Sequence, residues 1–264
     1  MLGLEMGSVR SLLTLFGYGL FLGFELLIPY RKPSVSKTGR WVNNLTLTLL
    51  NSVVMYLLFA ALIVHTAQYV TDNRLGVLNL ADIPRWTKIV ITVLIMDFVI
   101  YVWHLLNHEA PFFWRFHRVH HSDLNMDVST STRFHIGELA MSAVIKISLI
   151  LFLGAELIAV IVFETLLVFC AQFCHSSLRV PPRLDSLLWI LFVPPSMHRI
   201  HHSVVIKERN TNYGTILSVW DRWLGTLRKD VDQAEIRIGV GAYNNPEEVA
   251  LGRLLIMPFT RSVL

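Results

Sequence analysis

The sequence has few charged residues. Only 16% of its 264 residues are Asp, Glu, Lys or Arg, whereas soluble domains average about 25%. Hydrophobic residues make up 53% of the chain. These two values argue against an ordinary soluble domain and indicate a membrane protein.

Cysteine is also scarce, and the motifs of several enzyme classes are not apparent. Cys170 and Cys174 stand one helical turn apart in an apolar segment, which fits neither a redox pair nor a zinc ribbon and favours buried apolar residues. We find no phosphate-binding loop, nucleophile elbow or nucleic-acid motif. The net charge of +4 comes from scattered basic residues that flank apolar segments, as in the loops of membrane proteins.

Long apolar stretches account for most of the chain. A bilayer takes about 20 helical residues to cross, and three stretches of about this length cover residues 11–28, 45–70 and 86–106. The first lacks a basic leader and a cleavage site, so we expect an uncleaved helix. A fourth stretch at 139–173 is interrupted by Gly-Ala-Glu, which favours a hairpin of two short helices or a re-entrant pair. The sequence thus predicts an all-α integral-membrane bundle of about four to five membrane segments, forming one domain over residues 1–264.

The charges of the connecting loops predict the orientation of this bundle. Residues 31–40 carry four basic residues and no acidic one, which is typical of a cytoplasmic loop. We therefore expect the N-terminus and residues 71–85 outside. The same alternation places the histidine-rich segments inside, as a cytoplasmic cap.

Eight of the eleven histidines occur in three clusters with helical spacing. Residues at i, i+3 and i+4 share a helix face, so each cluster is expected to converge on one point. A lone histidine is more often a hydrogen-bonded structural residue, and we assign His65 to that class. Three clusters beside apolar segments favour ligands, because unbound buried imidazoles are costly. The clusters are His104 and His108, then His117, His120 and His121, and finally His198, His201 and His202.

The number of imidazoles bears on the metal. Imidazole suits zinc, copper, iron and nickel, but catalytic zinc usually takes three protein ligands and structural zinc four. Eight or more histidines therefore imply two metals. Two iron ions with four or five imidazoles each could bind and reduce dioxygen beside a lipid C–H bond, without the bridging carboxylates of ferritin-like sites.

These three boxes resemble those of the fatty acid hydroxylase and sterol desaturase superfamily of integral-membrane di-iron oxygenases. The similarity covers residues 90–230. It extends to Asp97 and Tyr101, to Arg133-Phe134-His135, to His175, and to the motifs NYG and WDRWLGTL after the third box. The surroundings of the boxes are most similar to bacterial members and to the alkylglycerol monooxygenase branch.

This resemblance implies a cofactor, co-substrate and partners. The cofactor would be two iron ions and the co-substrate O2, used to hydroxylate or desaturate a sterol, fatty acyl or ether lipid. The chain carries no recognisable haem or flavin domain, so an external donor of the ferredoxin or cytochrome b5 type is expected.

The resemblance and the chain order also suggest residues beyond the boxes. His135 and His175 match histidines of the family pattern, and we expect both to complete about ten imidazoles around two metals, five for each. Asp97 is expected to accept a hydrogen bond from a liganding imidazole or from Tyr101, because carboxylates of this kind orient metal ligands.

Two other function classes compete with an oxygenase. A membrane zinc hydrolase would need an acid/base carboxylate in the pocket, for which Glu109 and Glu138 are the candidates. A metal or haem transporter would need a continuous polar path, yet few charged residues, Asp97, Glu156 and Glu164 among them, interrupt the hydrophobic segments.

Overall fold

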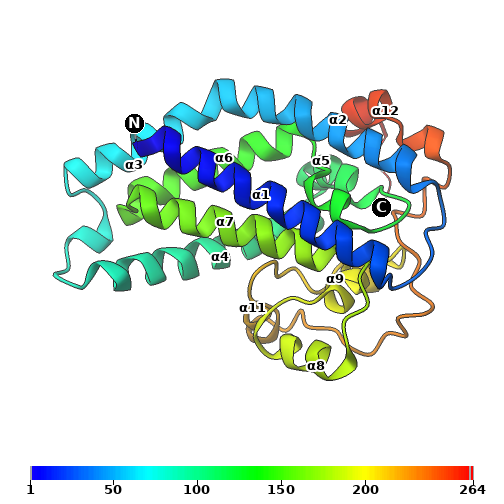
Figure 1. Cartoon of the computed structure of the whole chain (residues 1–264). Helices are drawn as coiled ribbons and strands as arrows, with labels where there is room; N and C mark the ends of the chain where they lie inside the picture. The colour runs from blue at the N-terminus through cyan, green and yellow to red at the C-terminus, as the bar shows by residue number, and fades with distance from the viewer. Residues whose placement is uncertain (1, 262, 264) are drawn as a thin grey trace.

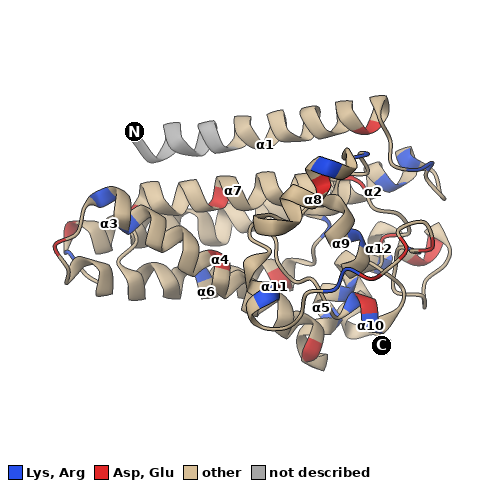
Figure 2. Cartoon of the chain, turned by 90° about the horizontal axis from the view of Figure 1, so that it is seen from below, with Lys and Arg blue, Asp and Glu red and all other residues tan. Residues whose placement is uncertain are grey.

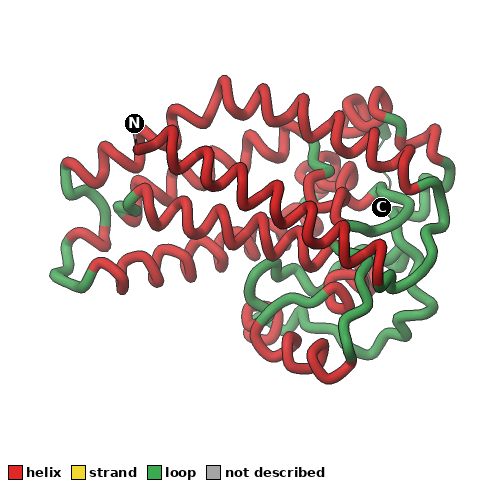
Figure 3. Tube along the Cα trace, in the orientation of Figure 1, coloured by secondary structure: helices red, strands yellow, loops and turns green. Residues whose placement is uncertain are grey.

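The computed structural model describes the backbone of residues 2–261 and 263, and the side chains of residues 11–261 and 263. Helices are the regular secondary structure of this part of the chain, joined at one end by long loops (Figure 3). The long helices lie side by side in an elongated bundle (Figure 1). They are α1 (Leu2–Leu27), α2 (Lys37–Met55), α3 (Ala61–Asp72), α4 (Arg85–Glu109), α6 (Ile136–Leu153) and α7 (Leu157–His175).

Four segments are long and apolar enough to cross a membrane, and Ser11–Leu27 is a shorter apolar helix. This confirms the predicted all-α bundle of about four to five membrane segments. Large apolar side chains on the outside of the bundle, such as Leu57 and Leu58, are exposed, as expected for a surface facing lipid. The four segments are Lys37–Asn79, Arg85–Glu109, Ile136–Leu153 and Leu157–His175.

The second membrane segment begins earlier than its apolar run. Helix α2 begins at Lys37, and a π-helical turn at Tyr56–Ala60 joins it to α3. Its first turns place Arg40 and Asn44 on one face, where both are buried. These polar residues contact Asp123 in the cap. The helix therefore includes polar first turns that precede the apolar run at residues 45–70.

The predicted helical hairpin is present as α6 and α7. Gly154 ends α6 in the left-handed region at φ 72°, a conformation that glycine adopts without steric cost. The Asn79 side chain donates a hydrogen bond to the Gly154 carbonyl, and Arg85 pairs with Glu156 at 2.6 Å. The turn between α6 and α7 and the connection from α3 to α4 therefore lie together, at the end of the bundle remote from the loops (Figure 1).

A cap of short helices and loops covers the other end of the bundle. Figure 2 shows that charged residues gather on this cap and are sparse along the long helices. This is the predicted histidine-rich cap. Its helices are α5 (Pro111–His121), α8 (Pro182–Leu191), α9 (Pro195–His201), α10 (Ile206–Arg209), α11 (Val219–Trp223) and α12 (Leu251–Ile256).

Two apolar clusters help to fix the position of the cap on the bundle. The bundle core packs Met96 of α4 against Ile150 and Phe163 of the hairpin. The cap core packs Met197 and Ile200 of α9. Because α9 carries the third histidine box on its other residues, this packing fixes where that box lies relative to the ends of α4 and α7.

Candidate metal centre

Nine buried histidines form two adjoining groups where the bundle meets the cap. The ligand nitrogens within each group lie within 4.8 Å of one another. The five-histidine group consists of His104, His108, His117, His121 and His201. The four-histidine group consists of His120, His175, His198 and His202.

The two groups divide each His-x-x-His-His box between them. His117 and His121 lie in the five-histidine group, whereas His120 between them lies in the other. The third box shows the reverse: His198 and His202 belong to the four-histidine group and His201 to the five-histidine group.

His104 and His108 share one group as expected, whereas the division corrects the expectation that each His-x-x-His-His box converges on one point. At 3.6 residues per turn, position i+4 is rotated about 40° from position i, and position i+3 about 60° the other way. Positions i and i+4 therefore share one metal group. The residue at i+3 points to the neighbouring group.

Three members of the five-histidine group are oriented through their Nδ1 atoms. His104 Nδ1 donates to the Tyr213 carbonyl at 2.7 Å, and His117 Nδ1 donates to Glu138 Oε1 at 2.8 Å. His201 Nδ1 donates to the Thr211 carbonyl at 2.8 Å. The Nε2 atoms of these three rings are buried and have no hydrogen-bond partner among the described residues. Each ring thus presents a lone pair to its group, the arrangement in which metal-bound histidines are found.

The four-histidine group brings its Nε2 atoms face to face. His175 Nε2 lies 3.0 Å from the Nε2 atoms of both His120 and His198, and 3.2 Å from that of His202. The other nitrogen of His175 donates to the Ala171 carbonyl at 2.7 Å. Two nitrogens bound at right angles to one ion, each about 2.1 Å from it, would lie about 3.0 Å apart. The spacing therefore fits ligands that share a metal ion.

Burial keeps five histidines of the cap neutral. It lowers the pKa of four of them well below the usual value, and neighbouring imidazoles lower it further. For His201, burial is also the largest cause and lowers the pKa to about 3. Neutral imidazole is the form that binds metal. The four histidines whose pKa lies well below the usual value are His120, His121, His198 and His202.

Comparison with known proteins agrees with this geometry. The family model described as fatty acid hydroxylase matches residues 89–226. The ornithine lipid hydroxylase of Rhizobium tropici is 32% identical over 248 residues, which cover 90% of this chain and 72% of that protein. The chain belongs to the fatty acid hydroxylase family.

More distant relatives of the chain share its central part. Rat cholesterol 25-hydroxylase is 28% identical over 54% of this chain and 47% of its own length. Human alkylglycerol monooxygenase is 31% identical over 51% of this chain and 29% of its own length. No solved structure matches the chain. The chain is thus an oxidoreductase of a membrane lipid hydroxylase family, as the three boxes predicted.

His135, which was expected to be a metal ligand, lies outside both histidine groups. His135 precedes α6, where its Nδ1 accepts a hydrogen bond from the Gly137 amide and its Nε2 donates to the Leu255 carbonyl. Both nitrogens are occupied, so the expected set of ten imidazoles becomes nine. His175 lies in the four-histidine group, and His65 lies in neither.

Asp97 and Tyr101 have other partners than those expected. Asp97 Oδ2 accepts a hydrogen bond from Trp220 Nε1 at 2.7 Å, and the Tyr101 hydroxyl pairs with Thr226 at 2.7 Å. Both partners belong to the WDRWLGTL motif that follows the third box. These residues therefore fasten the cap to α4 and do not touch a liganding imidazole through these bonds.

Asp221 of the same motif holds the loop that orients two ligands. Its carboxylate accepts hydrogen bonds from the amides of Tyr213 at 2.8 Å and Gly214 at 2.9 Å. The carbonyls of Tyr213 and Thr211 in this loop bind His104 and His201. The NYG and WDRWLGTL motifs thus act together to position imidazoles.

A buried polar network supports the second box from α2. Arg40 contacts Asp123 at 2.5 Å and Asp127 at 2.7 Å. Burial raises the pKa of Asp123, but the paired Arg40 more than offsets this and holds the pKa well below its usual range. Asn44 contacts Asp123 at 3.0 Å and accepts from Arg133 at 2.7 Å. Sequence reasoning missed this support, although the four-residue spacing of Arg40 and Asn44 before an apolar run could have indicated it.

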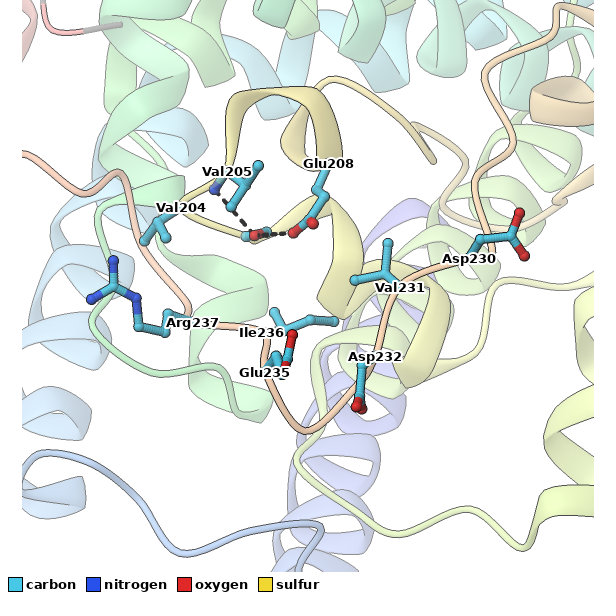
Figure 4. Close-up of a pocket in the computed structure, with 10 residues that line it drawn as sticks. Val204, Val205, Glu208, Asp230, Val231, Asp232, Glu235, Ile236 and Arg237 are labelled. Carbon is cyan, nitrogen blue, oxygen red and sulfur yellow. Dashed lines mark hydrogen bonds between the residues drawn. The ribbon is translucent and has the colours of Figure 1, made fainter.

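A surface pocket lies just beyond the third box (Figure 4). Its volume is about 310 Å³, and Glu208, Asp230, Asp232 and Glu235 contribute carboxylates to its lining. Glu208 accepts a hydrogen bond from Ser203, which follows the last histidine of the box. A lining of this kind suits polar groups and not an acyl chain.

Proposed function

We propose that this protein inserts oxygen from O2 into a C–H bond of a membrane lipid, at two iron ions held by its two histidine groups. Electrons would come from an external donor of the ferredoxin or cytochrome b5 type. The observation that carries the proposal is the set of buried Nε2 atoms without hydrogen-bond partners among the described residues of the five-histidine group. Buried Nε2 atoms that bind nothing lower the stability of the folded protein, which favours a bound metal at this group.

The chain's own residues would fix where the metals bind. His104, His108, His117, His121 and His201 would hold one ion, and the four-histidine group the other. Bound iron would supply the redox chemistry that activates dioxygen. The carbonyls of Tyr213 and Thr211 and the carboxylate of Glu138 would keep the imidazoles aligned, because the rings donate to them through Nδ1. The burial of all nine rings would exclude bulk water.

Neither candidate carboxylate supports a zinc hydrolase. Glu138 lies behind His117, to which it is hydrogen bonded. Glu109 is exposed and accepts from the Tyr213 hydroxyl at 3.0 Å. The names of the relatives, two hydroxylases and a monooxygenase, favour hydroxylation over desaturation.

We further propose a polar lipid as substrate and a cytoplasmic site. The ornithine lipid hydroxylase resembles this chain along most of its length, whereas the cholesterol and alkylglycerol enzymes match about half of it. The linker between α1 and α2 lies at the end of the bundle that carries the cap (Figure 1). Four basic residues lie in or next to this linker: Arg31, Lys32, Lys37 and Arg40. Basic loops are retained in the cytoplasm.

Lipid analysis of cells with and without the protein tests this function. We expect a lipid that gains the mass of one oxygen when the wild-type protein is present, and no such product with His201→Ala or His198→Ala. Purified protein should contain two irons and consume O2 when lipid and reductant are added. A protein that bound zinc and altered lipids without consuming O2 would be a hydrolase, and the proposal would fail.

A further inference from the structure

Arg209 is a buried cation without a counter-ion. It is the last residue of α10 and is only 3% exposed. Its Nε and Nη1 atoms are buried and have no hydrogen-bond partner among the described residues, and it forms no salt bridge with a described carboxylate. Burial lowers the pKa of Arg209 to about 10, so the guanidinium remains charged near neutral pH.

The other buried arginines among the described residues all have acceptors. Arg40 contacts two carboxylates, and Arg133 donates to the Val119 carbonyl and to Asn44. Arg118 donates to carbonyls near the C-terminus, and Arg199 to Gln233. Arg209 has only the face of an aromatic ring. An unpaired buried charge is costly, which points to a partner that the described residues do not supply.

This cation lies beside the five-histidine group. Its Cζ atom is 4.5 Å from the centroid of the Trp114 ring. The Trp114 ring is in turn 5.2 Å from that of His108 and 5.6 Å from that of His121. Both histidine groups consist of imidazoles and contain no carboxylate, so bound metal would add positive charge to this region. An anion is therefore the ligand that the region favours.

We propose that Arg209 binds an oxyanion on the head group of the lipid substrate, a carboxylate or a phosphate, and thereby holds the lipid beside the five-histidine group. The guanidinium fork matches both anions through paired hydrogen bonds. Trp114 keeps the fork in place through its ring face. This inference rests on the proposed function and specifies its substrate class as an acidic or zwitterionic lipid.

The first test compares lipids on the wild-type holoenzyme. The probes are an N-acyl amino-acid lipid with a free carboxylate, its methyl ester, and a phosphatidate with the same acyl chains. We expect the free acid or the phosphatidate to bind at least about 10-fold more tightly than the neutral ester, as loss of one charged hydrogen bond predicts. Equal binding of all three lipids would overturn the assignment, whether or not any of them is oxidised.

The second test uses Arg209→Gln and Arg209→Lys, with Lys207→Gln as the matched control. Lys207 is an exposed cation on the same short helix. Arg209→Gln should raise KM for the anionic lipid about 10- to 100-fold, with kcat and iron content close to wild type. The ester should be unaffected, Arg209→Lys should be intermediate, and Lys207→Gln should match wild type.

The outcomes separate this inference from the proposed function. Loss of iron in Arg209→Gln, or an equal loss with acid and ester, would show that Arg209 only supports the metal site. Wild-type protein that oxidised neutral lipids but not anionic ones would refute the inference and leave the oxygenase intact. Wild-type protein that oxidised no lipid, yet bound the anionic one through Arg209, would refute the oxygenase and leave the anion site.

Discussion

His120 and His121 are neighbours in the sequence, yet their imidazoles belong to different metal-binding groups. His121 stacks on His202 at 4.3 Å between ring centroids, so the two groups adjoin. Each His-x-x-His-His box thus contributes histidines to both groups.

This arrangement predicts which pairs of substitutions remove the same metal. His121→Ala and His201→Ala each weaken the five-histidine group, so the double variant should lose about one iron per chain. His121→Ala combined with His198→Ala should lose both irons, because one ligand is removed from each group. Iron content of purified protein, measured by elemental analysis against protein concentration, checks this.

The pairing within one box provides the control. If a box served one metal, His120→Ala with His121→Ala would remove one iron, and His121→Ala with His201→Ala would remove two. That result would contradict the division of the boxes seen in the structure.

A second prediction concerns the carboxylate behind His117. Glu138 Oε1 accepts from His117 Nδ1 at 2.8 Å, and both side chains are buried. Glu138→Leu should lower metal affinity about 10- to 100-fold, as is typical when a partner of a liganding imidazole is removed. Glu138→Gln keeps an acceptor oxygen and should cost less. Competition with a chelator measures both variants, and equal affinity of Glu138→Leu and wild type would contradict the role.

A third prediction separates His175 from His135. His175→Ala removes a ligand nitrogen and should release iron from the four-histidine group. His135→Ala should keep both irons, because His135 accepts from the Gly137 amide at the start of α6 and lies outside both groups. It should instead destabilise the protein by about 0.5–2 kcal/mol, the usual cost of losing an N-cap.

Iron content and thermal midpoint in detergent test this contrast. His65→Ala is the matched control and should change neither, since His65 lies in neither group. Loss of iron in His135→Ala would restore the ten-imidazole arrangement that the chain order suggested.

The membrane segments and the gathering of eight histidines could be predicted from the sequence because both follow from local patterns. Apolar runs and the spacing of histidines along one helix are visible in single stretches of chain. The division of the boxes follows from helix geometry as well, but only once the structure shows that there are two groups. The structure places His135 outside both groups, and the sequence could not show this, because a polar loop histidine can serve as a helix cap or as a ligand without any change in the sequence pattern.

Contacts between distant segments had no such local signal. Trp220 binds Asp97 across 123 residues, and Arg40 binds Asp123 across 83. A buried carboxylate requires a donor, so the sequence showed that Asp97 needs a partner. It did not show which one.

The last prediction addresses this link between the cap and α4. Trp220 stands next to Asp221, which binds the amides of Tyr213 and Gly214 in the loop that orients His104. Trp220→Phe removes the indole donor from the buried Asp97 carboxylate, which should cost about 1–3 kcal/mol. Asp97→Asn keeps an acceptor oxygen and should cost less.

Loss of the Trp220–Asp97 hydrogen bond and loss of the Tyr101–Thr226 hydrogen bond should have different effects on stability and iron content. Tyr101→Phe breaks only the hydrogen bond with Thr226 at 2.7 Å, so it should lower stability by about 0.5–1.5 kcal/mol. Trp220→Phe should in addition weaken iron binding at the five-histidine group, because the loop that holds His104 loses its anchor. Thermal midpoint and iron content, measured together for the three variants, test this order. If Trp220→Phe kept both values at wild-type level, the Trp220–Asp97 hydrogen bond would have no role in holding the cap to α4 or in positioning His104.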